Sequence, residues 1–134
     1  MIKHILDELS ELAQQQLYYE RITPIVGGAA TISLYTDRIP GTVERVSKSG
    51  KTAWIREDRA IRTDNNGQSE SQSYKYERDP DGHLWRATRR ATSLSYRKRH
   101  PHKLWKWKLS GAAKDSLGND VYFGIRNAYE DPHF

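Results

Sequence analysis

The sequence predicts an α+β protein made mainly of an antiparallel β-sheet of about six or seven strands, with one N-terminal amphipathic helix. Three observations support this fold class. Apolar residues recur at helical spacing over residues 1–20, short alternating segments run over residues 29–134, and turn sequences separate those segments. The segments follow in hairpin order and no linker-like stretch divides them, so the 134 residues are expected to form a single domain.

The predicted helix runs from Ile2 to about Tyr19. Its apolar residues fall on one face, and acidic and polar residues occupy the rest of the helical wheel. Pro24 and the pair Gly27–Gly28 end the helix. The apolar face could cover the sheet, or it could pack against its copy in another subunit, and the sequence leaves both arrangements open. The apolar positions are Ile5, Leu9, Leu12, Ala13 and Leu17.

Strand candidates alternate with turn sequences through the rest of the chain. "SKSG" at Ser47–Gly50, "DNNG" with its Asn66–Gly67 pair and "DPDG" at Asp79–Gly82 supply the residues that tight turns need. In "SQSYKYE" the alternation places Tyr74 and Tyr76 on one side of a strand. The last candidate, "VYFGIR", is expected to be the final strand. The others are "ATISLY", "GTVERV", "KTAWIRED", "AIRTD", "HLWRATRR" and "LWKWKL".

The composition describes a polar chain, in which 36% of the residues are hydrophobic and the mean hydropathy is −0.89. Eight Tyr and four Trp residues indicate that aromatic packing dominates the core. The absence of cysteine excludes disulfides and thiolate metal sites. No apolar run approaches the ~20 residues that span a bilayer. We therefore expect no membrane partner and a cytoplasmic location.

The formal charge of +5 is unevenly distributed. No acidic residue lies between Asp81 and Asp115, whereas this interval holds many cations, which predicts a basic face and an anionic partner. Interleaved cations and aromatic rings are typical of single-stranded nucleic acid binding. The cations are Arg86, Arg89, Arg90, Arg97, Lys98, Arg99, Lys103, Lys106, Lys108 and Lys114.

Strand alternation offers a structural interpretation of "LWKWKL". Trp105 and Trp107 share one face of the strand, while Lys106 and Lys108 share the other. This pattern suits a half-buried strand with a solvated outer face, and we favour that interpretation for the two tryptophans. The loop "SYRKRHPHK" has no apolar pattern, so it is a better candidate than this strand for contact with an anion.

No catalytic signature is present in the sequence. The five histidines show neither HExxH nor paired metal spacing, and no phosphate-binding glycine loop occurs. We interpret "HPH" at His100–His102 as surface and the carboxylates at Glu57–Asp58 and in "YED" as structural or solvent-facing. The sequence therefore favours a binding protein over an enzyme, with no metal and no cofactor.

Three arginines each follow an apolar strand segment: Arg38, Arg62 and Arg126. The planar fork of arginine can hold a phosphate in two places, so the coincidence of all three with strand ends favours a shared anion site. Alternatively, each pairs with its own neighbour and locks a turn; these neighbours are Asp37, Asp64 and Asp131. We expect Tyr129 and Phe134 to anchor the C-terminal residues and to hold Arg126 towards a phosphate.

Three strings, "LYTDRIPGTVERV", "RTDNNGQSESQSYKYERDPDG" and "GIRNAYEDPHF", resemble the first family of Thoeris anti-defence proteins, which are small and phage-encoded. The resemblance runs over Tyr35–Phe134. It implies a non-enzymatic sponge that sequesters cyclic ADP-ribose isomers made by bacterial TIR-domain defence proteins; some members also hold cyclic oligonucleotides. It also implies a homo-oligomer, dimer or hexamer, with pockets at subunit boundaries, acting in the cytoplasm of an infected bacterial host.

The resemblance also implies which residues bind the ligand. Arg62 matches the arginine before the "TDxNG" turn, Arg126 matches that of the closing "GxR" strand, and Trp85 is the nearest match to an aromatic that stacks on the base. With Arg38 from the strand-end pattern, these residues form the predicted site. Two charge-assisted forks and one stack suffice for micromolar binding (~8 kcal/mol) of a small anionic nucleotide. The insert "ATSLSYRKRHPHKLWKW" departs from the family pattern.

Two other functions remain open at this point. The first is a small DNA- or RNA-binding protein that uses the basic residues 86–108, whose affinity falls steeply with salt. The second is a protein inhibitor of a bacterial defence enzyme.

Overall fold

The computed structural model of the protein describes residues 2–113 and 118–130. Six strands form a closed antiparallel barrel in the order β1-β2-β3-β6-β7-β8, in which β8 pairs with both β7 and β1. The predicted α+β class with a mainly antiparallel sheet is therefore confirmed. The sequence did not predict that the sheet closes into a barrel. The strands are β1 (Ala29–Ser33), β2 (Arg38–Val46), β3 (Thr52–Glu57), β6 (Leu84–Ala91), β7 (Trp105–Leu109) and β8 (Asp120–Phe123).

Inward-facing residues of all six strands fill the barrel. Ile32, Val43, Ile55 and Phe123 are fully buried, and Trp107 packs its ring edge-to-face on Phe123 at a centroid distance of 5.1 Å. A barrel of so few strands has room for side chains alone. At Gly41, an added Cβ would lie 2.5 Å from Cγ2 of Ile55, so glycine is required for β2 and β3 to pass this closely.

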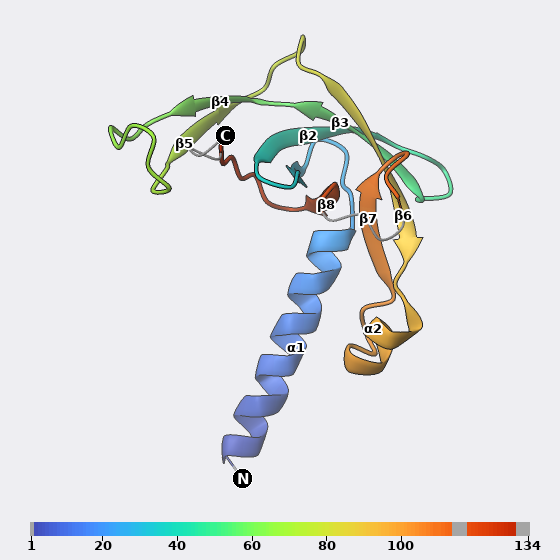
Figure 1. Ribbon diagram of the computed structural model, residues 1–134. Helices are drawn as coiled ribbons and strands as arrows, with labels where there is room; N and C mark the ends of the chain where they lie inside the picture. Colours follow the sequence, from blue (N-terminus) through green and yellow to red (C-terminus); the bar gives the residue numbers. More distant parts are fainter. Residues whose placement is uncertain (1, 114–117, 131–134) are drawn as a thin grey trace.

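A separate two-stranded sheet, β4 (Arg59–Arg62) paired with β5 (Tyr74–Glu77), extends from one flank of the barrel. It lies beside residues 124–130 in Figure 1, where the Tyr76 hydroxyl accepts from the Ala128 amide at 3.1 Å. In β5, Tyr74 and Tyr76 are half-buried while Lys75 and Glu77 are exposed, which confirms the predicted alternation. The hairpin is thus anchored through one face.

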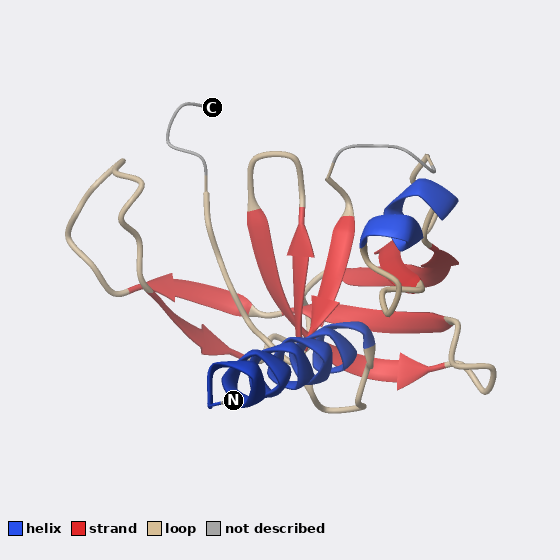
Figure 2. Ribbon diagram, turned by 90° about the horizontal axis from the view of Figure 1, so that it is seen from below, coloured by secondary structure: helices blue, strands red, loops and turns tan. Residues whose placement is uncertain are grey.

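The helix α1 (Ile2–Ile22) extends three residues beyond its predicted end. Figure 1 shows it projecting from the barrel, and among the described elements it packs mainly against β7 and β8. A second helix, α2 (Leu94–Arg99), connects β6 to β7 and was not predicted. Seen from below in Figure 2, α1 lies in front of the strands with α2 to one side. No helix among the described residues is long and apolar enough to cross a membrane.

The final strand ends at Phe123, so the prediction of a strand through "VYFGIR" is wrong for its last three residues. Gly124 adopts φ 79°, a left-handed conformation that favours glycine, and turns the chain onto the outside of the barrel. There the hydroxyl of Thr31 donates to the carbonyl oxygen of Ile125 at 2.7 Å. The backbone of Tyr129 then exchanges two hydrogen bonds with that of Arg38, of 2.9 and 3.1 Å. The described C-terminal residues are docked, as predicted; Asp131 and Phe134 lie outside the described residues.

Candidate ligand-binding groove

One end of α1 is fixed to the barrel by aromatic side chains. The indole Nε1 of Trp107 donates to the carbonyl oxygen of Ile22 at 2.7 Å. The hydroxyl of Tyr18 donates to the carbonyl oxygen of Trp105 and accepts from the Trp105 amide at 3.0 Å. Burial raises the pKa of Tyr18 above its ordinary value. The last turns of α1 therefore form one fixed wall.

The opposite wall is α2 and the loop that follows it. Ser93 caps α2, because its hydroxyl accepts from the Tyr96 amide at 3.2 Å. The guanidinium of Arg97 donates twice to the carbonyl oxygen of Thr92, at 3.0 and 2.7 Å, and the Thr92 hydroxyl donates to the carbonyl oxygen of Lys103 at 2.7 Å. These bonds close the loop and place His100, His102 and Lys103 towards α1.

Between the two walls lies a groove with a volume of about 700 Å³. This size is within the range of small-molecule sites. Its floor comes from β7 and β8, including Trp105, Lys106 and Tyr122. We call it the α1–α2 groove. Among the described residues, Asp120 supplies its one carboxylate. The rest of its lining combines aromatic rings with cations and histidines, namely Tyr18, Tyr96, Trp105, Trp107, Tyr122, Arg21, His100, His102, Lys103 and Lys106.

Several groups in the groove are available to a ligand. Lys103 has its ammonium 5.9 Å from the ring centre of Tyr18, and Lys106 makes no side-chain ion pair with the residues that the structure describes. The Nε2 atom of His102 also lacks a hydrogen-bond partner among those residues, but it is buried and a ligand does not contact it directly in this arrangement. Trp105 is 37% exposed. The guanidinium carbon of Arg89 lies 4.4 Å from the centre of its indole ring. The groove can therefore offer ring stacking and positive charge together.

The carboxylate in the groove is already neutralised. Asp120 pairs with Lys108, with 3.1 Å between the oxygen and Nζ, and Lys108 also donates to the carbonyl oxygen of Gly118 at 2.9 Å. Lys108 is 4% exposed, so the prediction that it lies on a solvated outer face is wrong. A buried cation keeps its charge by pairing, and the pair removes the repulsion that Asp120 would exert on an anion.

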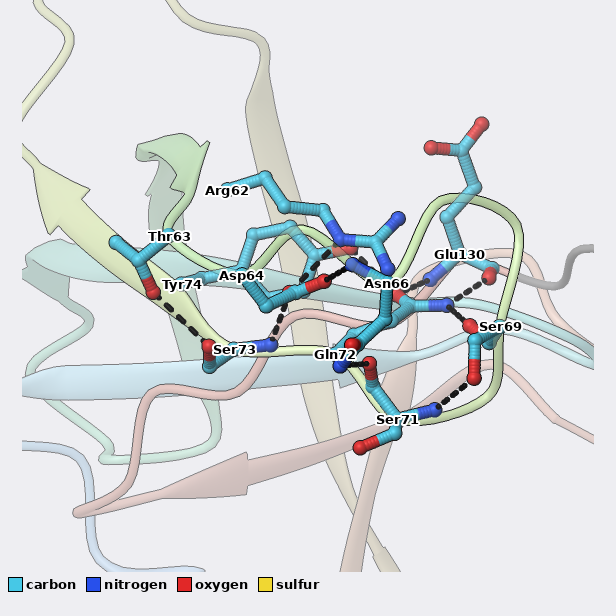
Figure 3. A network of polar contacts seen from close by, with 10 residues as sticks. All are labelled: Arg62, Thr63, Asp64, Asn66, Ser69, Ser71, Gln72, Ser73, Tyr74 and Glu130. Carbon is cyan, nitrogen blue, oxygen red and sulfur yellow. Dashed lines mark hydrogen bonds and ion pairs between the residues drawn. The ribbon is translucent and has the colours of Figure 1, made fainter.

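The arginines predicted to bind the ligand occupy the other flank of the barrel. Arg62 lies at the end of β4, and its Nε donates to Asp64 at 2.9 Å. Figure 3 shows the surrounding network, in which Asp64 also accepts from the amides of Asn66 and Ser73. These three bonds lower the pKa of Asp64 far below its usual value. This geometry agrees with the alternative interpretation, in which Arg62 pairs with its own neighbour and locks a turn.

Arg126 forms an ion pair that the sequence does not suggest. Its Nε donates to Asp58 at 2.8 Å and its Nη2 to the hydroxyl of Thr42 at 3.0 Å, while Thr42 donates to the second oxygen of Asp58 at 2.8 Å. The Asp58 side chain is 2% exposed. Arg126 thus neutralises a buried carboxylate and ties the C-terminal residues to β2 and the end of β3.

The remaining two predicted residues also contact groups of the protein. The guanidinium of Arg38 lies 5.8 Å from the ring centre of Tyr129. The indole of Trp85 donates to Glu57 at 3.3 Å and meets the ring of His83 edge-to-face at 4.5 Å. None of Arg38, Arg62, Trp85 and Arg126 lines the α1–α2 groove.

Much of the basic stretch also has a structural role. Arg90 donates to the carbonyl oxygens of Ala112 and Leu109 at 2.7 and 3.1 Å, and Arg97 and Lys108 make the bonds given above. Trp107 is 2% exposed, as a half-buried strand requires, whereas Trp105 is not buried. Over the described parts of the chain, no cluster of three or more His, Asp or Glu side chains could hold a metal ion.

No protein-family model, curated protein or solved structure matches this chain. The candidate site therefore depends on the geometry of the groove. The sequence pointed to one part of it, the loop "SYRKRHPHK", which supplies Tyr96, His100, His102 and Lys103. The sequence did not single out Tyr18, which lines the groove from α1.

Proposed function

We propose that the protein binds a small anionic nucleotide in the α1–α2 groove and holds it without cleaving it. The observation that carries this proposal is the combination, in one groove of about 700 Å³, of exposed aromatic rings with Lys103, Lys106 and two histidines. A nucleotide presents the complementary pair, a flat base and a phosphate group.

Trp105 and Lys103 are the first choices for the two contacts. Stacking of a base on an indole contributes about 1–3 kcal/mol, and each charge-assisted hydrogen bond to a phosphate adds about 1.5–3 kcal/mol. One stack with two or three such bonds sums to about 4–12 kcal/mol, so the ~8 kcal/mol of a micromolar complex requires the upper end of this range, because association itself costs at least about 4 kcal/mol. The site proposed here replaces the arginine forks with lysine and histidine side chains.

The resemblance to the Thoeris anti-defence family supports a narrower form of the proposal. The ligand is then a cyclic ADP-ribose isomer or a cyclic oligonucleotide, and the protein removes this immune signal in the cytoplasm of an infected bacterium. Sequestration needs affinity without turnover, in keeping with a sequence that lacks a catalytic signature.

A second candidate, nucleic-acid binding, draws on the outer face of the barrel. Arg45 stacks on the ring of Trp54 with 3.8 Å from its guanidinium carbon to the ring centre, and Arg86 lies 6.0 Å from the same ring. Exposed cations and an indole of this kind could track a phosphate backbone. This surface is separate from the α1–α2 groove, so the two functions can be distinguished.

The experiment is a thermal-shift titration of the protein against cyclic ADP-ribose isomers and cyclic di- and trinucleotides, with a short DNA as comparator, at low and physiological salt. We expect one small nucleotide to raise the melting temperature in both buffers and to be recovered intact after denaturation. Stabilisation by DNA alone, lost on addition of salt, would overturn the proposal in favour of the second candidate. Recovery of a cleaved ligand would show that the protein is an enzyme.

A further inference from the structure

One carboxylate oxygen in the α1–α2 groove is open to a ligand. The Oδ1 atom of Asp120 lies 3.1 Å from Nζ of Lys108, whereas its other oxygen, Oδ2, has no hydrogen-bond partner among the described residues. The side chain of Lys108 is buried, but that of Asp120 is 33% exposed. The accessible part of this carboxylate is therefore the part that Lys108 does not cover, and Asp120 belongs to the lining of the groove.

The open oxygen of Asp120 can only accept hydrogen bonds. An ionised carboxylate has no proton to donate, and Lys108 offsets its charge, so a ligand meets a neutralised pair with an unused acceptor. An ionised phosphate also offers only acceptors, so it does not complement this oxygen. A hydrogen-bond donor does, and the amino group of a nucleobase is such a donor.

The groove separates this acceptor from its cations along β7. Asp120 of β8 is the register partner of Lys108, and Trp105 precedes Lys108 by three residues, which is about 10 Å along a strand. Lys103 lies on the loop that leads into β7, and its ammonium is 5.9 Å from the ring centre of Tyr18. A ligand lying along β7 thus meets a cation first, then an indole and finally the open carboxylate oxygen.

Flat rings accompany Asp120 at this end of the groove. Tyr122 lies two residues after Asp120, so both side chains project from the same face of β8. Burial raises the pKa of Tyr122, and the nearby Asp120 and Tyr96 raise it further, so Tyr96 of α2 lies within electrostatic reach from the opposite wall. Aromatic rings beside an open acceptor suit the edge of a planar base.

We propose that Asp120 selects nucleotides whose base carries an exocyclic amino group. This inference rests on the proposed function and adds the chemistry of the base. The amino group donates to the open oxygen of Asp120, the base lies on Trp105 and the phosphate lies near Lys103. A base with a carbonyl oxygen in the same position turns an acceptor towards an acceptor, and the groove rejects it.

The pair with Lys108 makes the effect of one substitution predictable. In Asp120→Asn the amide oxygen faces the ammonium of Lys108, because an ammonium can only donate. The amide nitrogen then takes the place of the open oxygen and presents a donor to the ligand. This variant should therefore favour a base carbonyl where the wild type favours an amino group. A general loss of folded protein cannot reverse a preference between two ligands.

The experiment is a calorimetric titration of the full chain with the 5′-monophosphates of adenosine, guanosine, inosine, cytidine and uridine. The pairs adenosine–inosine and cytidine–uridine exchange an amino group for a carbonyl, and guanosine and inosine differ by an amino group alone. We expect the wild type to prefer the amino member of at least one pair by about tenfold or more. Asp120→Asn should abolish or reverse this preference. Glu77→Gln, which removes an exposed carboxylate on β5, is the control and should retain it.

A second variant keeps the test decisive if Asp120→Asn does not fold. Asp120→Glu retains the charge and the means to pair with Lys108, but it moves the carboxylate by one methylene and should lose most of the preference. Equal affinities within all three pairs in the wild type, a preference that both variants retain, or no binding of any monophosphate would overturn the proposal. The proposed function fails separately, because it requires that the cyclic nucleotides also fail to bind.

Discussion

The two flanks of the barrel use their cations differently. On the hairpin flank, Arg62 and Arg126 donate to Asp64 and Asp58, and both arginines thereby hold parts of the chain together. On the α1–α2 flank, Lys103 and Lys106 face an aromatic groove in which Asp120, its one carboxylate among the described residues, is paired with Lys108. An arginine at a strand end can therefore serve the fold when a carboxylate is within its reach. The proposed site depends instead on cations without an ion-pair partner among the described residues, which lie beside an exposed ring.

Removal of the Arg126 side chain has the largest expected effect on stability. Arg126→Ala should lower the free energy of unfolding by about 3 kcal/mol, because it leaves the carboxylate of Asp58 buried and unpaired. Urea denaturation measures the loss. Asp58→Asn in the same chain should restore part of it, since the orphaned charge is gone. Loss of nucleotide binding with unchanged stability would instead support the site predicted from the sequence.

Removal of the Trp105 ring should affect nucleotide binding much more than stability. Trp105→Ala should weaken nucleotide binding about 10- to 100-fold through the lost stack, while the free energy of unfolding changes by less than about 1 kcal/mol because the ring is already partly exposed. Calorimetric titration measures the affinity. Trp54→Ala, on the outer face of the barrel, is the matched control and should bind normally; equal effects of the two variants would contradict the proposed site.

Lys103 should make a smaller contribution. Lys103→Ala should lower nucleotide affinity about tenfold at low salt and less at high salt, because one charge-assisted contact to the phosphate is lost and salt screens the remainder. Titrations at two salt concentrations test this. Lys48→Ala removes a cation from the exposed β2–β3 turn and should have no effect. An identical loss in both variants would indicate attraction by net charge alone.

Arg62→Ala should have a smaller effect than any of these on either property. Arg62 and Asp64 make an exposed pair within one turn, and such pairs contribute little to stability. We expect a slight loosening of the β4–β5 hairpin, visible as faster amide exchange there, with nucleotide affinity unchanged. A large fall in nucleotide affinity would instead indicate that Arg62 is part of the binding site.

The pH dependence of unfolding should report the tyrosines on the α1–α2 flank. Burial raises the pKa of Tyr18 and Tyr122, so their folded-state pKa values exceed the ordinary value near 10. Their contribution to stability is fully present below pH ~10 and is lost as pH rises through the folded pKa values, because the unfolded chain ionises first. Tyrosinate absorbance should show late-titrating groups in the folded protein, and Tyr18→Phe should remove one of them.

Local sequence patterns predicted the structural features that depend only on residues close together in the sequence. The period of α1 and the alternation of Tyr74 and Tyr76 follow from such patterns, and they predicted the fold class. The tight turn predicted at Asn66–Gly67 is instead part of a longer loop over residues 63–73 between β4 and β5. The partner of Arg126 is Asp58, which is 68 positions away and reaches it only through barrel closure. No local pattern encodes that pairing, so the sequence does not predict it.

The groove was missed for a similar reason. It is assembled from α1, α2, β7 and β8, whose residues meet only when β8 closes the barrel against β1. The helix α2 is short and depends on the Ser93 cap and on the bonds of Arg97, so the apolar period that reveals longer helices is absent. The sequence identified the loop that contributes Lys103 and both histidines to the groove, but not the rings that these residues face.

The most direct test uses NMR of the four indole N–H groups, which Trp→Phe variants assign one by one. Trp105 and Trp107 lie in the α1–α2 groove, Trp85 lies in the site predicted from the sequence, and Trp54 lies on the outer face. On addition of the nucleotide that stabilises the protein, we predict that the Trp105 signal moves most and that the Trp85 signal stays in place. A shift of Trp85 with Trp105 unmoved would contradict the groove as the binding site.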